Sequence, residues 1–114
     1  MKESWWLSGP MTGLPKWNYP LFIRAAKKLR KMGYDIITPV EINPAPKSKD
    51  ADLEWWPLVR RDLDVIWKKR PVGIILLPGW KNSAGSRMEK LMISKKLCGK
   101  VRHYADIEKS QQKR

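Results

Sequence analysis

The sequence predicts an α/β fold, a flavodoxin-like (Rossmann-like) three-layer sandwich around a parallel sheet of four to five strands. Short apolar runs of strand length recur along the chain, at 3–8, 34–38, 72–77 and 100–104. Amphipathic helical patterns lie between them, at 20–32, 52–70 and 85–97. Strands that alternate with helices favour a parallel sheet with right-handed crossovers.

The first strand leads into a glycine-flanked loop, Gly9–Gly13, where two glycines permit a ligand to approach the backbone closely. The loop matches neither the dinucleotide fingerprint nor the Walker loop, so alone it does not identify a ligand. The helix 20–32 follows and ends at Gly33, a C-cap residue. Its predicted core face is Phe22, Ala25, Ala26 and Leu29, and its basic positions are Arg24, Lys27, Lys28, Arg30 and Lys31.

The second strand, 34–38, is followed by a long loop, 39–54, which holds three prolines and a polar run. A loop of this length in a small domain is usually functional or mobile. Glu41 and Asn43 are possible ligand contacts within it. A plain surface loop is the other interpretation.

A second helix is expected over 52–70, with its regular part starting at Pro57, a favourable first-turn residue. Its predicted apolar stripe is Val59, Leu63, Ile66 and Trp67. Asp62 falls on that stripe, and a carboxylate facing the core is uncommon unless it is paired or functional. Asp64 points elsewhere and is assigned to the surface.

The segment 74–89 contains a buried strand, a polar loop and the start of a helix at Ala84. Pro78 and Gly79 stop the strand, and Glu89 falls near the first turn of the helix. Such a helix N-terminus presents free N–H groups and a positive dipole end to an anion, and Glu89 could act on what is held there. Alternatively, Glu89 simply stabilises the helix dipole. Inward positions of this helix are Met88, Met92, Ile93 and Leu97, with Gly99 as its cap.

Composition limits the function classes. The chain has 114 residues, 24 Lys and Arg against 11 Asp and Glu, and a net charge of +13, which predicts anionic partners such as nucleotides, phosphates or nucleic acid. Lysine-rich helix faces that are merely solvated are the alternative. One Cys and one His disfavour a disulfide, a zinc site and triad chemistry, so we expect no metal and no cofactor. No signal peptide or membrane span is apparent, and we expect a cytoplasmic protein without membrane contact.

The predicted topology brings several polar residues to one rim, since ligands bind beyond the carboxyl ends of strands in open sheets of this kind. The loops 9–18, 39–54 and 78–84 leave those ends, and Asp62 is reachable from its helix. Two carboxylates beside small residues suit glycosyl chemistry, in which one carboxylate attacks the anomeric carbon and an acidic group assists the leaving group. The rim residues are Gly9, Gly13, Glu41, Asn43, Ser83, Ser86 and Glu89.

Four motifs in this order carry a family resemblance: LSGPMTG at 7–13, RRDL at 60–63, LLPGW at 76–80 and SAGSRME at 83–89. Together they resemble the nucleoside 2-deoxyribosyltransferase-like superfamily, in its small phage and prophage branch of uncharacterised function. They also show some likeness to 2′-deoxynucleoside 5′-monophosphate N-hydrolases. The resemblance extends from residue 5 to about 102, and it implies one such domain over 1–104 with a polar, frayed tail at 105–114. A phage-encoded copy would act in the host cytoplasm.

The resemblance implies roles for individual residues. Glu89 matches the nucleophile that forms a deoxyribosyl-enzyme intermediate, and Asp62 matches the carboxylate that assists sugar placement and base departure. Ser83 matches a serine that meets the 5′-phosphate, with Lys81 and Arg87 as possible additional cations. The expected substrate-binding residues are Gly9, Pro10, Met11, Gly13, Ser83, Gly85, Ser86 and Trp80, with Trp17 as a second candidate for stacking on the base. Glu89 is expected to be ionised, favoured by the helix dipole and the basic rim.

Three positions differ from the family pattern: Trp6 replaces a usual tyrosine, Val72 an acidic residue and Leu91 a small residue. The differences at Trp6 and Val72 favour one alternative, a nucleotide-binding module without turnover. A second alternative is a nucleic-acid-binding protein that uses the basic helix 20–32. By analogy with the family, a homodimer or larger homo-oligomer is expected. Four tryptophans are assigned to the core in preference to an interface: Trp5, Trp55, Trp56 and Trp67.

Overall fold

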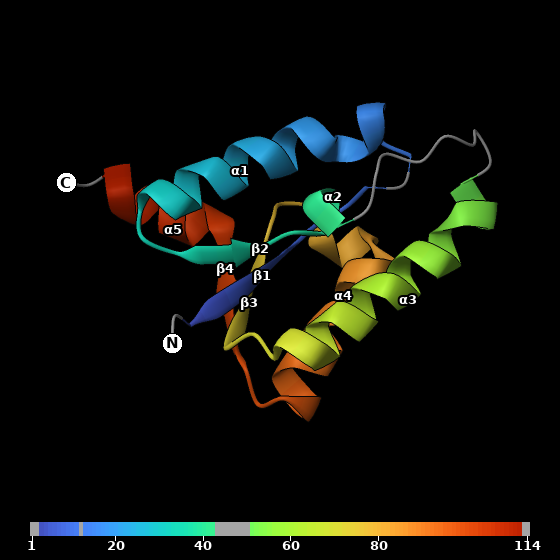
Figure 1. Cartoon of the computed structure of the whole chain (residues 1–114). Helices are drawn as coiled ribbons and strands as arrows, with labels where there is room; N and C mark the ends of the chain where they lie inside the picture. Colours follow the sequence, from blue (N-terminus) through green and yellow to red (C-terminus); the bar gives the residue numbers. More distant parts are fainter. Residues whose placement is uncertain (1–2, 12, 43–50, 113–114) are drawn as a thin grey trace.

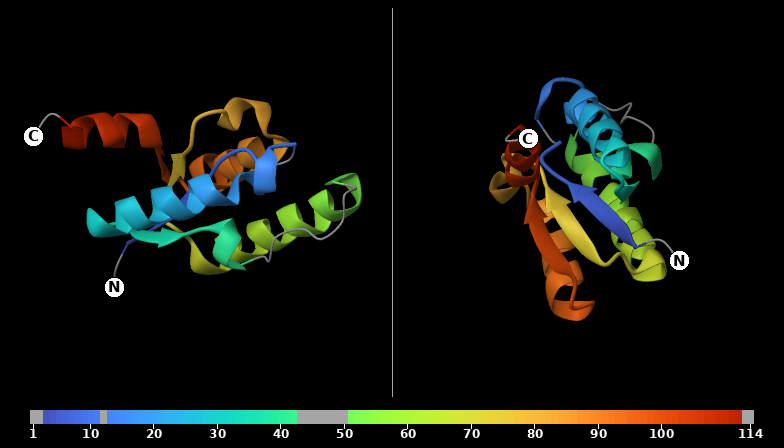
Figure 2. Two further views of the ribbon diagram at one scale, coloured as in Figure 1. Left: turned by 90° about the horizontal axis from the view of Figure 1, so that it is seen from above. Right: turned by 90° about the vertical axis from the view of Figure 1, so that its left-hand side faces the viewer.

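The computed structural model describes residues 3–11, 13–42 and 51–112 and, in the last of these ranges, the side chains of 56–110. Its sheet has four parallel strands in the order β2-β1-β3-β4. They are β1 (Ser4–Ser8), β2 (Asp35–Ile37), β3 (Gly73–Leu76) and β4 (Lys100–His103). The strands lie side by side with helices on both sides (Figure 2). The predicted flavodoxin-like α/β class is therefore confirmed.

Side chains along β1, β2 and β3 alternate between two hydrophobic cores, one on each face of the sheet. Trp5, Leu7 and Ile75 face α1 (Tyr19–Lys31) and α5 (Tyr104–Gln112). Trp6 and Ile74 face the opposite side, which carries α3 (Ala51–Lys69) and α4 (Ala84–Leu91). Figure 1 shows these two helix layers above and below the strands. Because β1 and β3 are the central pair, they contribute side chains to both cores.

The predicted core of α1 is confirmed: its four predicted residues are at most 2% exposed. Gly33 ends this helix with a φ of +101°, a conformation that glycine adopts without a steric cost. On α3, Asp62 is buried and Asp64 exposed, as the helical spacing predicts. The buried carboxylate therefore faces the sheet and not solvent.

Two expectations for α3 are wrong. The helix begins at Ala51 and passes through Pro57, so the proline does not open it. Trp56 and Trp67 are 52% and 51% exposed and do not belong to the core. The buried stripe runs through Val59 and Ile66, and Trp67 is turned about 100° from Ile66 around the axis. The Arg70 guanidinium lies 4.4 Å from the centroid of the Trp67 ring and covers part of it.

The chain after α4 also differs from expectation. A π-helical turn, η3 (Met92–Lys96), continues α4, and Cys98 takes the positive φ expected of a cap. Gly99 is required for another reason: a Cβ there would lie 2.7 Å from Cγ2 of Ile93.

Residues 105–112, expected to be a frayed tail, belong to α5 instead. Tyr104 and Ile107 are one helical turn apart, and both are buried against the α1 side of the sheet. The prediction failed because two apolar residues in a polar segment gave too weak a periodic signal.

The segment predicted as a loop after β2 begins with a short helix, α2 (Pro39–Ile42). Asn43 and the rest of 43–50 lie outside the described residues, as does Thr12 of the glycine-flanked loop. Within the described ranges, no helix is both long enough and apolar enough to cross a membrane. At the other edge of the sheet from β2, all four residues of β4 are exposed.

Candidate active site

A pocket lies where β1 and β3 end, between α3, α4 and the loop that follows β1. Asp62 enters it from α3 and Glu89 from α4, and each is 5% exposed. Its walls are formed by Gly9, Met11, Trp17, Pro39, Leu58, Val59, Ser83, Gly85 and Ser86. The two predicted carboxylates are therefore together in one largely apolar enclosure.

The Glu89 carboxyl is held by two donors from β1. Trp6 Nε1 donates to Glu89 Oε1 over 2.9 Å, and Ser8 Oγ donates to the same oxygen over 2.6 Å. Trp6 and Ser8 are two residues apart, so both point to the α4 face of the sheet. A carboxylate oxygen has two lone pairs, and these two hydrogen bonds occupy both of them on Oε1. Oε2 is therefore the oxygen that remains for Asp62 or a substrate.

Two serines extend this network to the start of α4. The Oγ atoms of Ser8 and Ser86 are 2.9 Å apart. Since Ser8 has one hydroxyl proton and gives it to Glu89, Ser86 is the donor to Ser8. Ser83 is the N-cap of α4, and its Oγ accepts a hydrogen bond from the Ser86 backbone N–H over 3.2 Å. The positions of all three serines are thus fixed by the sheet and the helix start.

Burial dominates the electrostatics of Glu89. It raises the pKa of this carboxyl, while hydrogen bonds from Ser8, Trp6 and Asp62 oppose the rise. Burial therefore opposes the ionisation of Glu89 that the helix dipole and the basic residues were expected to favour. Glu89 is the sixth residue of α4, beyond the first turn where the dipole acts, and burial costs the charged form more.

Asp62 forms a hydrogen bond with the Glu89 carboxyl. Such a bond between two carboxyl groups needs a proton on one of them, so the two groups are placed to share a proton. The charge of Asp62 also contributes, after burial, to a raised pKa of Tyr19. A pair of this kind can supply a nucleophile and an acid at the same time.

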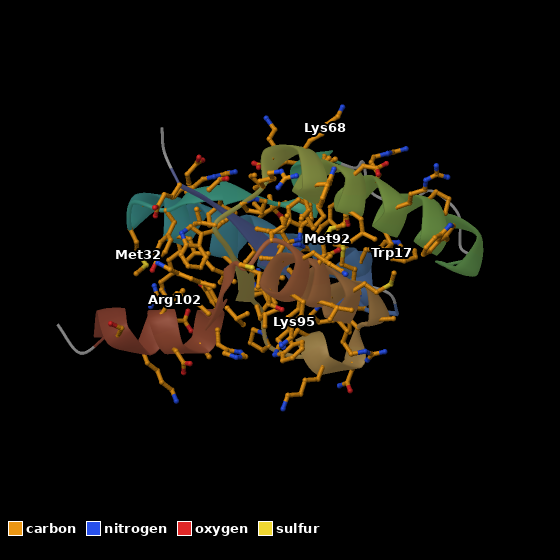
Figure 3. All side chains as sticks on the ribbon, turned by 90° about the horizontal axis from the view of Figure 1, so that it is seen from below. Trp17, Met32, Lys68, Met92, Lys95 and Arg102 are labelled. Atoms are coloured by element: carbon orange, nitrogen blue, oxygen red, sulfur yellow. The ribbon has the colours of Figure 1, made fainter. Side chains whose placement is uncertain are left out.

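The pocket contains most of the predicted substrate-binding residues: Gly9, Met11, Ser83, Gly85 and Ser86. Figure 3 labels Trp17 near α3, and this side chain lines the pocket too, in agreement with its prediction. Packing requires a glycine at position 9, because a Cβ on Gly9 would lie 2.7 Å from Leu77 Cβ.

Pro10 and Gly13 are near the pocket but are not among its lining residues. The Pro10 carbonyl accepts a hydrogen bond from Asn18 Nδ2 over 2.9 Å, which ties the loop to the turn η1 (Pro15–Asn18). Gly13 is exposed and has a φ of +82°, so it shapes the loop that Pro10 begins.

The other predicted rim residues are elsewhere. Trp80, in the turn η2 (Trp80–Asn82), lines a separate groove with His103. Lys81 and Arg87 are exposed outside the pocket, and Arg87 Nη1 donates to the Lys81 carbonyl over 2.6 Å. Glu41 forms an ion pair with Arg30, with 2.5 Å between Oε1 and Nη2, and this hydrogen-bonded pair lowers the pKa of Glu41.

Sequence reasoning missed Ser8 and misjudged Trp6. Trp6 was noted for the hydroxyl it lacks, yet its indole N–H reaches the carboxyl of Glu89 directly. A usable signal was present in the sequence. Ser8 directly follows the apolar run Trp5–Leu7, and a serine buried with such a run must find a polar partner. Among the described residues, no cluster of three His, Cys, Asp or Glu side chains is placed to hold a metal ion.

Comparison with known proteins places the chain in a family without assigning an activity. Residues 3–102 match the family described as "Domain of unknown function (DUF4406)", and the chain belongs to that family. No curated protein and no solved structure matches it.

Proposed function

We propose that this protein cleaves or transfers the N-glycosidic bond of a 2′-deoxynucleoside or 2′-deoxynucleotide, with Glu89 as the nucleophile. The observation that carries the proposal is the buried Glu89–Asp62 pair, in which Oε1 of Glu89 is held by Trp6 and Ser8. A structural carboxylate has no need of a second carboxyl beside it in a pocket. The motif resemblance to nucleoside 2-deoxyribosyltransferase-like proteins supports the same chemistry.

The proposed reaction begins when Oε2 of Glu89 attacks the anomeric carbon of the sugar. The C1′–O bond to Glu89 forms as the C1′–N bond to the base breaks, and the proton shared with Asp62 goes to the leaving base. Water then attacks C1′ while Asp62 takes up its proton, which regenerates Glu89 and releases the sugar. If a second base attacks in place of water, the net reaction is transfer.

The donors on Oε1 have a specific part in this scheme. Trp6 and Ser8 stabilise the ionised carboxylate and fix its rotation, so that Oε2 is directed away from β1. Trp6 supplies an N–H where relatives usually carry a tyrosine hydroxyl. The exchange therefore changes the donor atom and keeps a hydrogen bond to the nucleophile.

The apolar lining favours the sugar and base over the phosphate. None of the described side chains that line the pocket is a lysine or arginine. The N–H groups of Ala84 and Gly85 begin α4 and have no partner within the helix, so they are the groups that a 5′-phosphate would use. Trp17 is positioned to contact the base.

The test is release of free base, followed by chromatography, from deoxynucleosides and their 5′-monophosphates. Glu89→Gln should abolish release, and Asp62→Asn should reduce it strongly. Asp64→Asn is the matched control, since Asp64 is exposed on the same helix. Release that requires a second base identifies a transferase. Release that persists in Glu89→Gln would contradict the proposed nucleophile.

One observation favours the second candidate, a binding module of the same fold. Burial raises the pKa of Glu89, and a protonated carboxyl binds a ligand but does not attack it. Tight binding of a nucleoside without release of base from any substrate would establish this alternative. The expected homo-oligomer remains a prediction for either candidate.

A further inference from the structure

A second concave site lies on the other side of the loop 78–83, where β3 ends and α5 begins. It is an open groove, and its side chains include Trp80, Lys81, Asn82 and His103. We call it the Trp80 groove. Like the pocket of Glu89, it lies at the carboxyl edge of the sheet, the edge that binds ligands in open α/β folds.

Two planar rings form a corner of the Trp80 groove. The centroids of the Trp80 and His103 rings are 6.0 Å apart, and the rings are inclined by 47°. The turn that carries Trp80 is held by its backbone, since Ser83 N donates to the Trp80 carbonyl over 3.0 Å and Asn82 N to the Gly79 carbonyl over 3.1 Å. A ligand ring therefore meets an aromatic surface that is already in position.

Three cationic residues belong to the turn that carries Trp80 or to α4, which follows it. Lys81 is exposed in the groove, and Arg87 is bound to the carbonyl of Lys81. The ammonium of Lys90 lies 5.4 Å from the centroid of the Trp80 ring. The described residues that line the groove include no Asp or Glu. The local charge is therefore positive beside a stacking platform, the combination that binds nucleotide units.

We infer that the Trp80 groove binds a nucleotide unit, with the base against Trp80 and His103 and the phosphate near Lys81 and Lys90. The unit can belong to a free mononucleotide or to a single strand of nucleic acid. This inference does not depend on the proposed reaction, because it uses none of the residues around Glu89.

The groove is a better nucleotide site than the basic face of α1. On α1, Lys28 forms an ion pair with Glu108 and Arg30 forms one with Glu41, so two of its five cations are neutralised. The large apolar side chain exposed on that helix is Ile23, which offers no aromatic surface.

His103 provides a direct readout, since it is the single histidine of the chain and its imidazole Cε1–H NMR signal needs no assignment. The full chain carrying Glu89→Gln, which prevents turnover, is titrated with thymidine 5′-monophosphate and, separately, with a twelve-nucleotide oligothymidylate. We expect a saturable shift of the His103 signal. A response to both ligands or to the mononucleotide alone indicates a free-nucleotide site, and a response to the oligonucleotide alone indicates single-stranded nucleic acid.

Trp80→Leu should weaken the response about tenfold, since stacking of one base on an aromatic side chain contributes on that scale. Trp67→Leu is the matched control, because it removes an exposed tryptophan from α3. Lys81→Ala tests the phosphate contact without touching the core, and Lys31→Ala removes the same charge from α1. An unmoved His103 signal, or equal effects within either matched pair, would overturn the inference. Base release by the wild-type chain is measured separately, so either proposal can fail alone.

Discussion

The pocket of Glu89 and the Trp80 groove share one loop and differ in almost every physical property. The pocket is the more enclosed of the two, and its two carboxyls are hydrogen-bonded within a largely apolar wall. The groove is open and cationic, with its polar groups on the surface. Ser83, at the end of the loop, lines the pocket. Trp80 and Lys81, nearer its start, line the groove. Burial, and not chain position, determines which residues can perform covalent chemistry.

The largest effect should come from removing the nucleophile. Glu89→Gln keeps the size of the side chain, and its amide oxygen can still accept from Trp6 and Ser8. Without a nucleophilic oxygen, base release should fall about a thousandfold or more. Chromatographic assays at saturating substrate measure this. A loss of less than tenfold would mean that Glu89 only shapes the pocket.

Asp62→Asn should have the next largest effect. Removal of a general acid typically reduces rates about 10²- to 10⁴-fold, and the loss should be smallest for substrates whose base is a good leaving group. Rates on substrates of graded leaving-group ability measure this. Asp64→Asn, two residues away on the exposed face, should change them less than twofold.

Ser8→Ala should have a smaller effect than the two carboxyl substitutions, and it should act on the pKa of Glu89 in the buried pocket. It removes a hydrogen bond that favours the ionised form of Glu89, so the already raised pKa of Glu89 should rise further. The acid limb of the rate–pH profile should move to higher pH, with a loss of about tenfold at neutral pH. Ser94→Ala is the control, because the Ser94 hydroxyl, in η3, donates to the Lys90 carbonyl and not to Glu89. An unmoved acid limb in Ser8→Ala would contradict the role of Ser8.

The smallest expected effect concerns stability. It is a gain, whereas the preceding substitutions are expected to cause losses of activity. A raised folded-state pKa means that Glu89 stabilises the fold when protonated, below its unfolded-state pKa, and loses that contribution as the pH rises through the folded-state pKa. Glu89→Gln mimics the protonated form, so its Tm should exceed that of the wild type by a few degrees at pH 8, and by less at pH 4. Thermal denaturation at both pH values measures the difference. An equal Tm at pH 8 would mean that the buried charge is fully compensated.

Most of the fold and the central pair of the site could be predicted from sequence. Asp62 was found because a carboxylate on a buried helical stripe conflicts with the periodicity around it, and Glu89 because a strand, a small-residue loop and a helix precede it. The rise in the pKa of Glu89 could not be predicted, because it depends on how deeply β1 and α3 enclose the side chain. Trp80 was assigned to the pocket of Glu89, but it lines the separate groove. Chain order shows that a loop lies at the rim of the sheet, and it does not show which side of the loop a side chain faces.

Exposure of the outermost strand has a consequence for self-association. The edge strand β4 presents Lys100 and Arg102 beside Val101, all of them exposed, along unpaired backbone groups that another strand could extend. Two such edges repel each other while their charges are unscreened, and the repulsion fades as the Debye length falls to about 3 Å at 1 M salt. A polyanion would neutralise the same charges. The basic side chains of β4 thus oppose edge-to-edge aggregation, and concentrated salt should weaken that protection.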